Sequence, residues 1–187
     1  MPTIIAFSGS PHENGCTSTL IKEILRGAET QGFQSTFYSL NDTGVRPCQG
    51  CHYCRTHNGC AVNDALQPAY ADIDTADVII FGSPIYFHQI TGQAKIWIDR
   101  MFPMMEFKDG SFVPRHPGKK AVTVFSQGYH KADEYRGVID MTNRIIQTFG
   151  WTVVETLLCY NTSAQDFVMS PVLMQKALDI GKALGKT

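Results

Sequence analysis

The chain has 187 residues, of which 43% are hydrophobic and 18% are charged, and its formal net charge is −1. A chain of this length and apolar content can bury the core of one ordinary α/β domain, which excludes wholesale disorder. It has no apolar run near the length of about 20 residues that a membrane-spanning helix needs, no leader-like N-terminus and no block of like charge. We therefore expect a single domain over residues 1–187 in the cytoplasm that binds neither membrane nor nucleic acid.

Strands and helices alternate almost throughout the predicted structure. Short apolar runs predict strands, in chain order, at residues 3–8, 33–40, 77–82, 121–126 and 151–160. Apolar residues at helical spacing predict helices at about 20–32, 64–75, 94–105, 138–149 and 171–184. A Cys-rich loop is expected at about residues 41–63 and an exposed excursion at 108–118. This alternation predicts an α/β fold with a five-stranded parallel sheet covered by helices on both faces.

The loop after the first predicted strand, GSPHENGCTST at residues 9–19, has the features of a phosphate site. It leads into a helix, whose first turn offers free backbone N–H groups and partial positive charge. The hydroxyls of Ser10, Thr17 and Ser18 add donors suited to a phosphate monoester. Cys16 stands where a Walker A loop needs lysine, and no GxGxxG motif occurs. The alternative is that the hydroxyl residues only cap the helix.

Two further loops follow the third and fourth predicted strands. Ligands of parallel α/β sheets bind beyond the carboxyl ends of the strands, where the strand order reverses. The third strand leads into GSPIYFH, in which small residues precede Tyr86 and Phe87, whose rings can stack on a flat ligand. Ser126, Gln127 and Gly128 end the fourth strand and offer amide hydrogens. Either aromatic residue alone is better explained as cover for the sheet edge, but three loops directed at one crevice favour a ligand.

Four of the six cysteines lie close together in the sequence, at Cys48, Cys51, Cys54 and Cys60. A compact C-x2-C-x2-C run followed by one more cysteine is typical of an iron–sulfur cluster, whereas structural zinc usually takes paired knuckles with a longer spacer. Free thiols or a disulfide are the alternative, and zinc is the third. We expect His52 and His57, which lie in the same loop, to be solvated, and Cys159 to be a buried small hydrophobic residue.

Together these motifs resemble the NAD(P)H-dependent FMN reductases of flavodoxin-like fold. The likeness covers about the first 130 residues. It rests on Gly9-Ser10-Pro11, Asn14-Gly15-Cys16-Thr17, Cys48-Gln49-Gly50-Cys51, Ile80 to Phe87, Thr91-Gly92, Ile98-Asp99-Arg100 and Ser126-Gln127-Gly128. It implies a three-layer sandwich with strand order 2-1-3-4-5 and a noncovalently bound FMN.

The resemblance also assigns the cofactor contacts. It places the FMN phosphate at Ser10, His12, Cys16, Thr17 and Ser18. It places the isoalloxazine ring near Pro84, Ile85, Tyr86 and Phe87, with Ser126, Gln127 and Gly128 as the third loop. The family often has arginine at the position of His12 and asparagine at that of Cys16, so FMN binding is expected to be weaker than is usual in the family.

The implied activity is an FMN-dependent oxidoreductase. Electrons would pass from NAD(P)H through FMN to a small-molecule acceptor such as a quinone, flavin, nitro or azo compound. The cofactor carries this chemistry, so no catalytic acid or base is expected. The alternatives are a flavodoxin-type electron carrier, against which the net charge of −1 argues because such carriers are acidic, and a redox or metal sensor without FMN.

The cysteine spacing resembles that of the iron–sulfur flavoproteins, a branch of the same family. This implies a [4Fe–4S] cluster on Cys48, Cys51, Cys54 and Cys60 that exchanges electrons with FMN near a subunit interface. The resemblance also implies a homodimer or homotetramer. The apolar stretch from Met101 to Phe107 is expected to lie on a surface of association.

Overall fold

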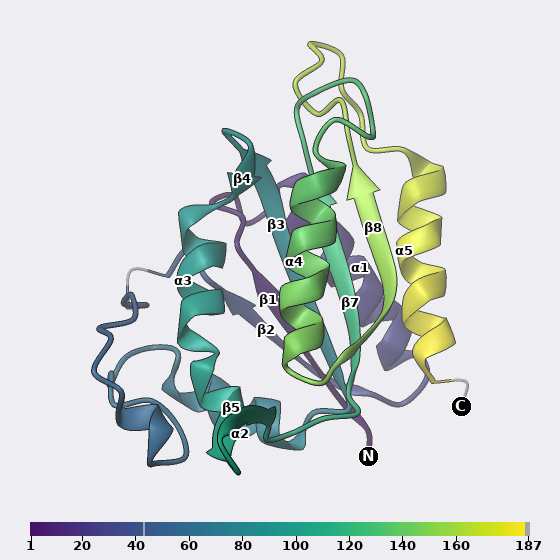
Figure 1. Cartoon of the computed structure of the whole chain (residues 1–187). Helices are drawn as coiled ribbons and strands as arrows, with labels where there is room; N and C mark the ends of the chain where they lie inside the picture. Colours follow the sequence, from purple (N-terminus) through teal and green to yellow (C-terminus); the bar gives the residue numbers. More distant parts are fainter. Residues whose placement is uncertain (43, 186–187) are drawn as a thin grey trace.

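The computed structural model describes residues 1–42 and 44–185. Its central sheet has five parallel strands, β1 (Thr3–Ser8), β2 (Gln34–Ser39), β3 (Val78–Tyr86), β7 (Lys120–Ser126) and β8 (Thr152–Cys159) (Figure 1). Their spatial order is β2-β1-β3-β7-β8, which confirms the predicted order 2-1-3-4-5. A two-residue strand that was not predicted, β4 (Gln89–Ile90), pairs antiparallel with the end of β3.

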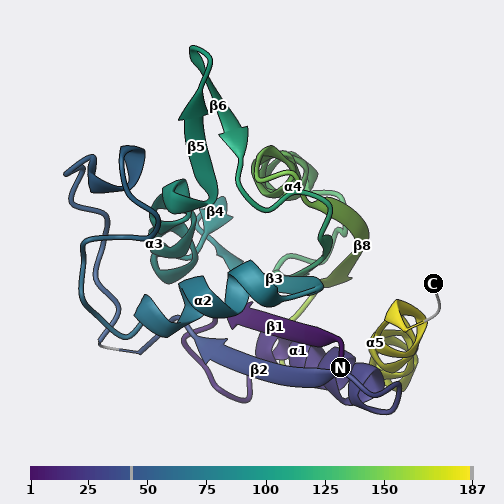
Figure 2. The ribbon, with the colours of Figure 1, turned by 90° about the horizontal axis from the view of Figure 1, so that it is seen from below.

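Helices cover both faces of this sheet, which confirms the predicted three-layer flavodoxin-like fold. They are α1 (Cys16–Glu29), α2 (Gln67–Thr75), α3 (Gly92–Arg100), α4 (Arg136–Thr148) and α5 (Pro171–Leu184). Figures 1 and 2 show α1 and α5 on one face and α2, α3 and α4 on the other. Within residues 1–42 and 44–185, no helix combines the length and the apolar character needed to cross a membrane.

Strands β1 and β3 are largely apolar because both of their faces are buried. Ile4 and Ile80 belong to the core under α1 and α5, whereas Phe7 and Phe81 belong to the core under α2, α3 and α4. Trp97 of α3 is fully buried against the second face, with its ring centroid 4.9 Å from that of Phe7 and 4.8 Å from that of Phe81. Large rings therefore anchor α3 directly onto the two strands that lead to the predicted ligand crevice.

Strand β3 is longer than predicted, because residues expected to form a loop continue the sheet. Parallel pairing with β7 extends as far as Pro84 opposite Ser126, whereas pairing with β1 stops at Gly82. Beyond Gly82 the strand has one parallel neighbour only, and proline, which lacks an N–H donor, is tolerated at such an edge.

The predicted surface of association at residues 101–107 is wrong for Met101, Pro103 and Met104, which are buried. Helix α3 ends at Arg100 rather than near residue 105, and a short 3-10 helix, η2 (Phe102–Met104), follows. Met101 and Met104 are buried in the core, and Phe107 at the end of the stretch is exposed. The proline inside η2 cannot continue an α-helix, and the turn that results directs the methionines inward.

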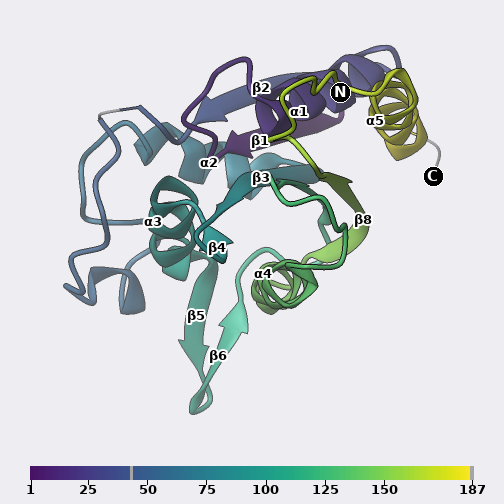
Figure 3. The same ribbon diagram turned by 90° about the horizontal axis from the view of Figure 1, so that it is seen from above.

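The predicted excursion at 108–118 is largely an ordered hairpin. Strands β5 (Met105–Lys108) and β6 (Ser111–Pro114) pair antiparallel and project from the body of the molecule (Figure 3). Phe107 and Phe112 lie edge-on to one another with ring centroids 5.1 Å apart, and both are exposed.

Helices α1 and α5 pack unusually closely because glycines meet at their crossing. A Cβ atom on Gly181 would lie 2.0 Å from the carbonyl oxygen of Ile24, and one on Gly27 would lie 2.2 Å from that of Leu178. Both distances are far below van der Waals contact, so backbone meets backbone with no room for a side chain.

We predict that Gly181→Ala destabilises the protein by about 1–3 kcal/mol, because overpacking outweighs the gain in helix propensity. Gly137→Ala in α4 is the matched control, since nothing lies within 4 Å of its added Cβ and the change should stabilise slightly. Urea unfolding of both variants measures the difference. Equal stability of the two variants would contradict the close crossing.

Candidate functional site

A cavity of about 800 Å³ opens at the carboxyl ends of β1, β3 and β7. It collects residues from all three of the loops that were predicted to meet. Ten of the predicted cofactor residues line it, namely Ser10, His12, Cys16, Pro84, Ile85, Tyr86, Phe87, Ser126, Gln127 and Gly128. We refer to this space as the flavin cavity.

Thr17 and Ser18 lie behind the flavin cavity and do not line it. Both are buried, and their hydroxyls bond to other parts of the protein. Thr17 Oγ1 lies 2.8 Å from Ser126 Oγ, and Ser18 Oγ lies 2.8 Å from Ser8 Oγ. These hydroxyls therefore join the start of α1 to the ends of β1 and β7, rather than offering the free donors that were expected.

The start of α1 is open at the flavin cavity. Its N-cap is Gly15, which has no side-chain cap, so capping by a hydroxyl residue is wrong as an explanation of this loop. The first intrahelical bond is donated by Thr19 N to Gly15 O at 2.9 Å. The N–H groups of the three preceding helical residues have no carbonyl partner in the helix, and this is the usual origin of an anion site.

A strained turn forms the lip of the flavin cavity. Tyr86 pairs with Gln89, so Phe87 and His88 alone connect β3 to β4. Their φ angles are 48° and 64°, a left-handed conformation that two-residue hairpin loops usually give to Asn-Gly. Bulky residues in this region cost of order 1–3 kcal/mol each, and such strain clusters at functional sites. Phe87 is 100% exposed, so packing against this chain does not account for it.

Five residues that line the flavin cavity were not among the predicted cofactor residues, namely Gly15, Tyr129, Tyr135, Thr162 and Ser163. Thr162 and Ser163 follow the carboxyl end of β8, so extending the same strand-end rule to the fifth strand would have found them. Ser163 comes so close that its Oγ would lie 2.2 Å from a Cβ on Gly128. Tyr135 begins α4 and carried no signal in the sequence.

Gln127 is the most buried polar side chain of the flavin cavity, at 1% exposed. Its Nε2 donates to the carbonyl oxygen of Lys131 at 2.6 Å, which fixes the orientation of the amide. Its Oε1 is buried and has no hydrogen-bond partner among the described residues. Buried acceptors are rarely left unpaired, which is consistent with a missing donor in this region.

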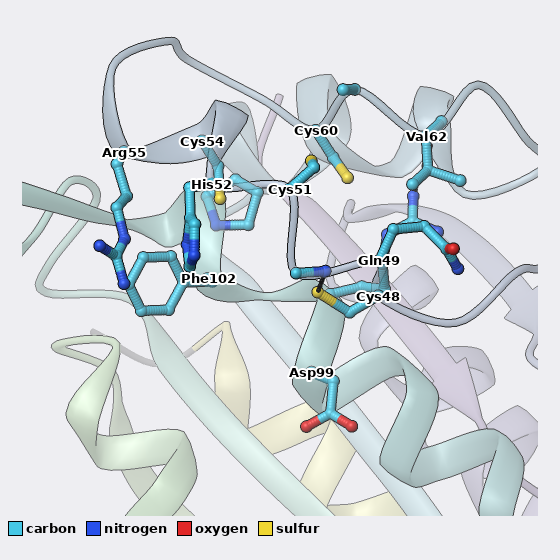
Figure 4. A pocket seen from close by; sticks show the side chains of 14 residues that line it. Cys48, Gln49, Cys51, His52, Cys54, Arg55, Cys60, Val62, Asp99 and Phe102 are labelled. Carbon is cyan, nitrogen blue, oxygen red and sulfur yellow. Dashed lines mark hydrogen bonds between the residues drawn. The ribbon is translucent and has the colours of Figure 1, made fainter.

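A second cavity, of about 210 Å³, lies beside the end of α3, and all four clustered cysteines line it. We refer to it as the cysteine cavity. Figure 4 shows its border, formed by Cys48, Cys51, Cys54, Cys60, Asp99 and Phe102 among others. Cys48 and Cys51 are exposed and Cys54 and Cys60 are half-buried. The pKa of the Cys54 thiol is raised, mainly by burial and further by the other three thiols.

The four thiols surround a space rather than converging on a point. In the described part of the chain, no three His, Cys, Asp or Glu side chains are arranged to hold a single metal ion. Structural zinc needs four ligand atoms at about 2.0–2.3 Å from one centre, and the described side chains do not form such a site. All six cysteines are free thiols in this structure, which therefore shows no disulfide in the cysteine loop. Four thiols around one cavity are a donor set that an iron–sulfur cluster takes.

The two histidines of the cysteine loop and the isolated Cys159 lie in different surroundings. His52 lines the cysteine cavity, whereas His57 is exposed and stacks on Tyr53 with ring centroids 4.0 Å apart. Cys159 is buried, as predicted. Burial, together with the neighbouring Cys16 thiol, raises the pKa of Cys159 to about 12, so its thiol stays protonated at neutral pH.

Comparison with known proteins finds iron–sulfur flavoproteins among the chain's relatives in sequence. An iron–sulfur flavoprotein of Methanocaldococcus jannaschii is 36% identical over 101 residues, which cover 54% of this chain and 52% of that protein. One from Archaeoglobus fulgidus is 26% identical over 148 residues, covering 78% and 63%. The chain thus spans about half to two thirds of the length of these curated relatives.

The chain also resembles solved structures in fold and matches the model of one protein family. An NAD(P)H:quinone oxidoreductase from Methanothermobacter marburgensis superposes with a TM-score of 0.77 over 98% of both chains at 14% identity, which shows the shared fold. The model of the NADPH-dependent FMN reductase family matches residues 2–148, which include the three loops of the flavin cavity and all four clustered cysteines. Because this match spans well over half of the chain, the protein belongs to the NADPH-dependent FMN reductase family.

Proposed function

We propose that the protein is an oxidoreductase that holds FMN noncovalently in the flavin cavity and takes electrons from NAD(P)H. The observation that carries this proposal is the meeting of an open helix start and an aromatic lip in one cavity of about 800 Å³. Such a cavity offers an anion site for a phosphate at one end and ring surfaces for a flat heterocycle at the other. The family match supports the same cofactor.

The phosphate end suits a dianion for two reasons. The backbone N–H groups at the start of α1 point their partial positive charge at this end, and Ser10 and His12 lie beside them. In addition, the described residues that line the cavity include no Asp or Glu, so no fixed negative charge opposes a phosphate. Ser10 Oγ is itself held by His12, donating to its carbonyl oxygen at 3.0 Å and accepting from its N–H at 3.2 Å.

The ring end is built from rigid apolar and aromatic residues. Pro84 and Ile85 continue strand β3 into the wall, and Tyr86 and Phe87 stand at the lip. Gln127 also lines the cavity, with its amide held by the carbonyl oxygen of Lys131. When bound, FMN supplies hydride and single-electron chemistry, so the side chains need only bind the ring, orient it and exclude water from one face.

The acceptor is proposed to be a flat small molecule such as a quinone, flavin, nitro or azo compound. The fully exposed ring of Phe87 leaves an unused aromatic surface at the mouth of the cavity, where a planar molecule can stack. A cytoplasmic homodimer or homotetramer remains part of this proposal, supported by the exposed Phe107 and Phe112 of the projecting hairpin.

A second element of the proposed function is a [4Fe–4S] cluster in the cysteine cavity, held by Cys48, Cys51, Cys54 and Cys60. The gathering of these four thiols around one space favours it, as do the curated relatives, which are iron–sulfur flavoproteins. When bound, the cluster supplies one-electron chemistry beside a two-electron cofactor. Without it, the protein would act as a plain flavin reductase.

The activity is tested by mixing FMN-loaded protein with NADH or NADPH and a quinone. We expect steady oxidation of at least one nicotinamide that depends on FMN, because the open lip admits both substrates. Protein heated before the assay serves as the control. Stable FMN binding without any turnover would instead support the flavodoxin-type carrier.

The position of the phosphate is tested by Cys16→Asp. A carboxylate in the first turn stabilises the helix itself by about 0.3–1 kcal/mol, so the fold should persist. The same carboxylate repels a bound phosphate, and we expect the Kd for FMN to rise at least about tenfold, or 1.4 kcal/mol. Binding of riboflavin, which lacks the phosphate, should change little. Cys16→Ser is the neutral control, and an equal loss for both ligands would place the phosphate elsewhere.

The cluster is tested by iron and sulfide analysis of anaerobically prepared protein. We expect about four of each per chain, as a [4Fe–4S] cluster contains. Cys60→Ala should lose most of both while keeping FMN, because the two cavities have no residue in common. Cys159→Ala is the matched control, since that buried thiol lines neither the cysteine cavity nor the flavin cavity. Wild-type protein with flavin and no iron would identify a plain reductase.

A further inference from the structure

We infer that Arg100 is a positioning residue for the cysteine cavity, where its guanidinium ties both ends of the cysteine loop to the end of helix α3. This inference rests on the [4Fe–4S] site of the proposed function. It concerns how this chain holds four thiols in place, which their spacing in the sequence does not explain.

The guanidinium contacts the chain immediately before and after the four cysteines. Its Nη1 donates to the carbonyl oxygen of Arg46 at 2.7 Å, and its Nη2 donates to that of Val62 at 3.3 Å. Residues 47–61, which include all four cysteines, lie between these two points. One planar guanidinium thus closes the base of the loop. A lysine could not do the same, because its ammonium group is a single point charge.

Asp64 makes this tie rigid. Its carboxylate pairs with Arg100 at 2.6 Å and 3.2 Å, and it also accepts from the N–H of Arg46 at 2.9 Å. Burial alone would raise the pKa of Asp64, but hydrogen bonds from Arg100 and from backbone N–H groups outweigh it and leave that pKa below its usual value. The pair therefore stays ionised at neutral pH, although the Arg100 and Asp64 side chains are 0% and 1% exposed.

The remaining donor of Arg100 and a nearby amide complete the support. Arg100 Nε donates to Tyr70 Oη at 3.2 Å, and that hydroxyl donates to the carbonyl oxygen of Arg100 at 3.0 Å. All five N–H groups of the guanidinium can thus be satisfied. Gln67 Nε2 lies 2.6 Å from the carbonyl oxygen of Cys60 and 2.7 Å from that of Val62. The loop backbone at Cys60 is therefore held from behind.

The cysteine loop has little regular structure of its own that could hold the four thiols in place. Its only regular element in the described residues is the three-residue 3-10 helix η1 (Tyr53–Arg55), and η1 has no buried residue. A segment with few buried apolar contacts opens easily unless other groups hold it. A buried ion pair is costly and is often no better for stability than apolar residues of the same volume. Its retention here is therefore better explained by the shape that it gives to the loop.

Helix α3 carries this constraint to the flavin cavity. At its start, the N-cap Thr91 donates from Oγ1 to the carbonyl oxygen of Gly9 at 2.7 Å, and its N–H donates to Ser83 Oγ at 3.0 Å. At its end, Arg100 holds the cysteine loop. A nine-residue helix is about 14 Å long, so one rigid element, anchored by buried Trp97, has an end at each site. Arg100 thus links the cysteine loop to the helix whose start is bonded to the chain next to the flavin cavity.

The test uses the double variant Arg100→Met/Asp64→Leu, which removes both buried charges together and keeps their volume. Because such replacements are often neutral for stability, the fold should remain while the loop loses its tie. After anaerobic reconstitution we expect iron and sulfide per chain to fall at least threefold, with the Kd for FMN within about twofold of wild type. The matched control is Arg115→Met/Glu106→Leu, which removes a half-exposed ion pair of 3.3 Å on the hairpin and should leave iron unchanged.

Arg100→Lys provides a second measurement that does not depend on the double variant. It keeps a cation beside Asp64 but cannot reach both carbonyls, so the cluster should form and then, well below the melting temperature of the variant, lose iron to a chelator several-fold faster than wild type. A merely structural role would lower the melting temperature and leave the rate of iron loss alone.

The results of these measurements distinguish the positioning role of Arg100 from the cluster itself and from the flavin oxidoreductase. Wild-type iron content and chelation rate in both Arg100 variants would overturn the positioning role and leave the cluster standing. Loss of FMN together with iron would show that Arg100 supports the whole fold, which also overturns it. Wild-type protein that binds FMN but no iron would overturn the cluster and this inference together, while the flavin oxidoreductase would stand.

Discussion

The parallel pairing of β1 with β3 is the constraint on which both the fold and the flavin cavity depend. It places Ser8 beside Gly82, and the N–H of Gly9 then donates to the Gly82 carbonyl at 2.8 Å just beyond the last pair. The loop that starts α1 and the strand end that carries the aromatic lip therefore leave the sheet side by side. Without this pairing, the anion site and the ring surfaces would not share a cavity.

The close packing of α1 on the end of β3 favours a residue without a side chain at Gly82. A Cβ atom there would lie 2.6 Å from Ile21 Cδ1 and 2.8 Å from Thr17 Cγ2, both on α1. Helix α1 can therefore lie directly against the end of β3, with its first turn aimed at the cavity. Thr17 and Ser18 then become buried links between this turn and the sheet, which explains why their hydroxyls are not available to a ligand.

The cysteine cavity is organised by a different principle. Apolar packing shapes the sheet and its helices, whereas the cysteine loop is positioned by charge and hydrogen bonds centred on Arg100 and Asp64. Helix α3 belongs to both regions. Its middle packs in the apolar core through Trp97, and its end carries the guanidinium of Arg100. Two sites with different stabilising forces thus share one rigid support.

The strand order was implied by the resemblance to a known family. Local patterns in the sequence determined the strands and helices, the two-sided cover of the sheet, the three loops at the strand ends and the cysteine spacing. These features depend on residues close to one another in the chain, and apolar periodicity and turn residues report them directly. Only the tertiary structure decided which side chains bond across the fold. Thr17 meets Ser126 across 109 positions, and Arg100 meets Arg46 across 54. It also decided the burial of Met101 and Met104, because that burial depends on neighbours that the chain supplies from distant segments.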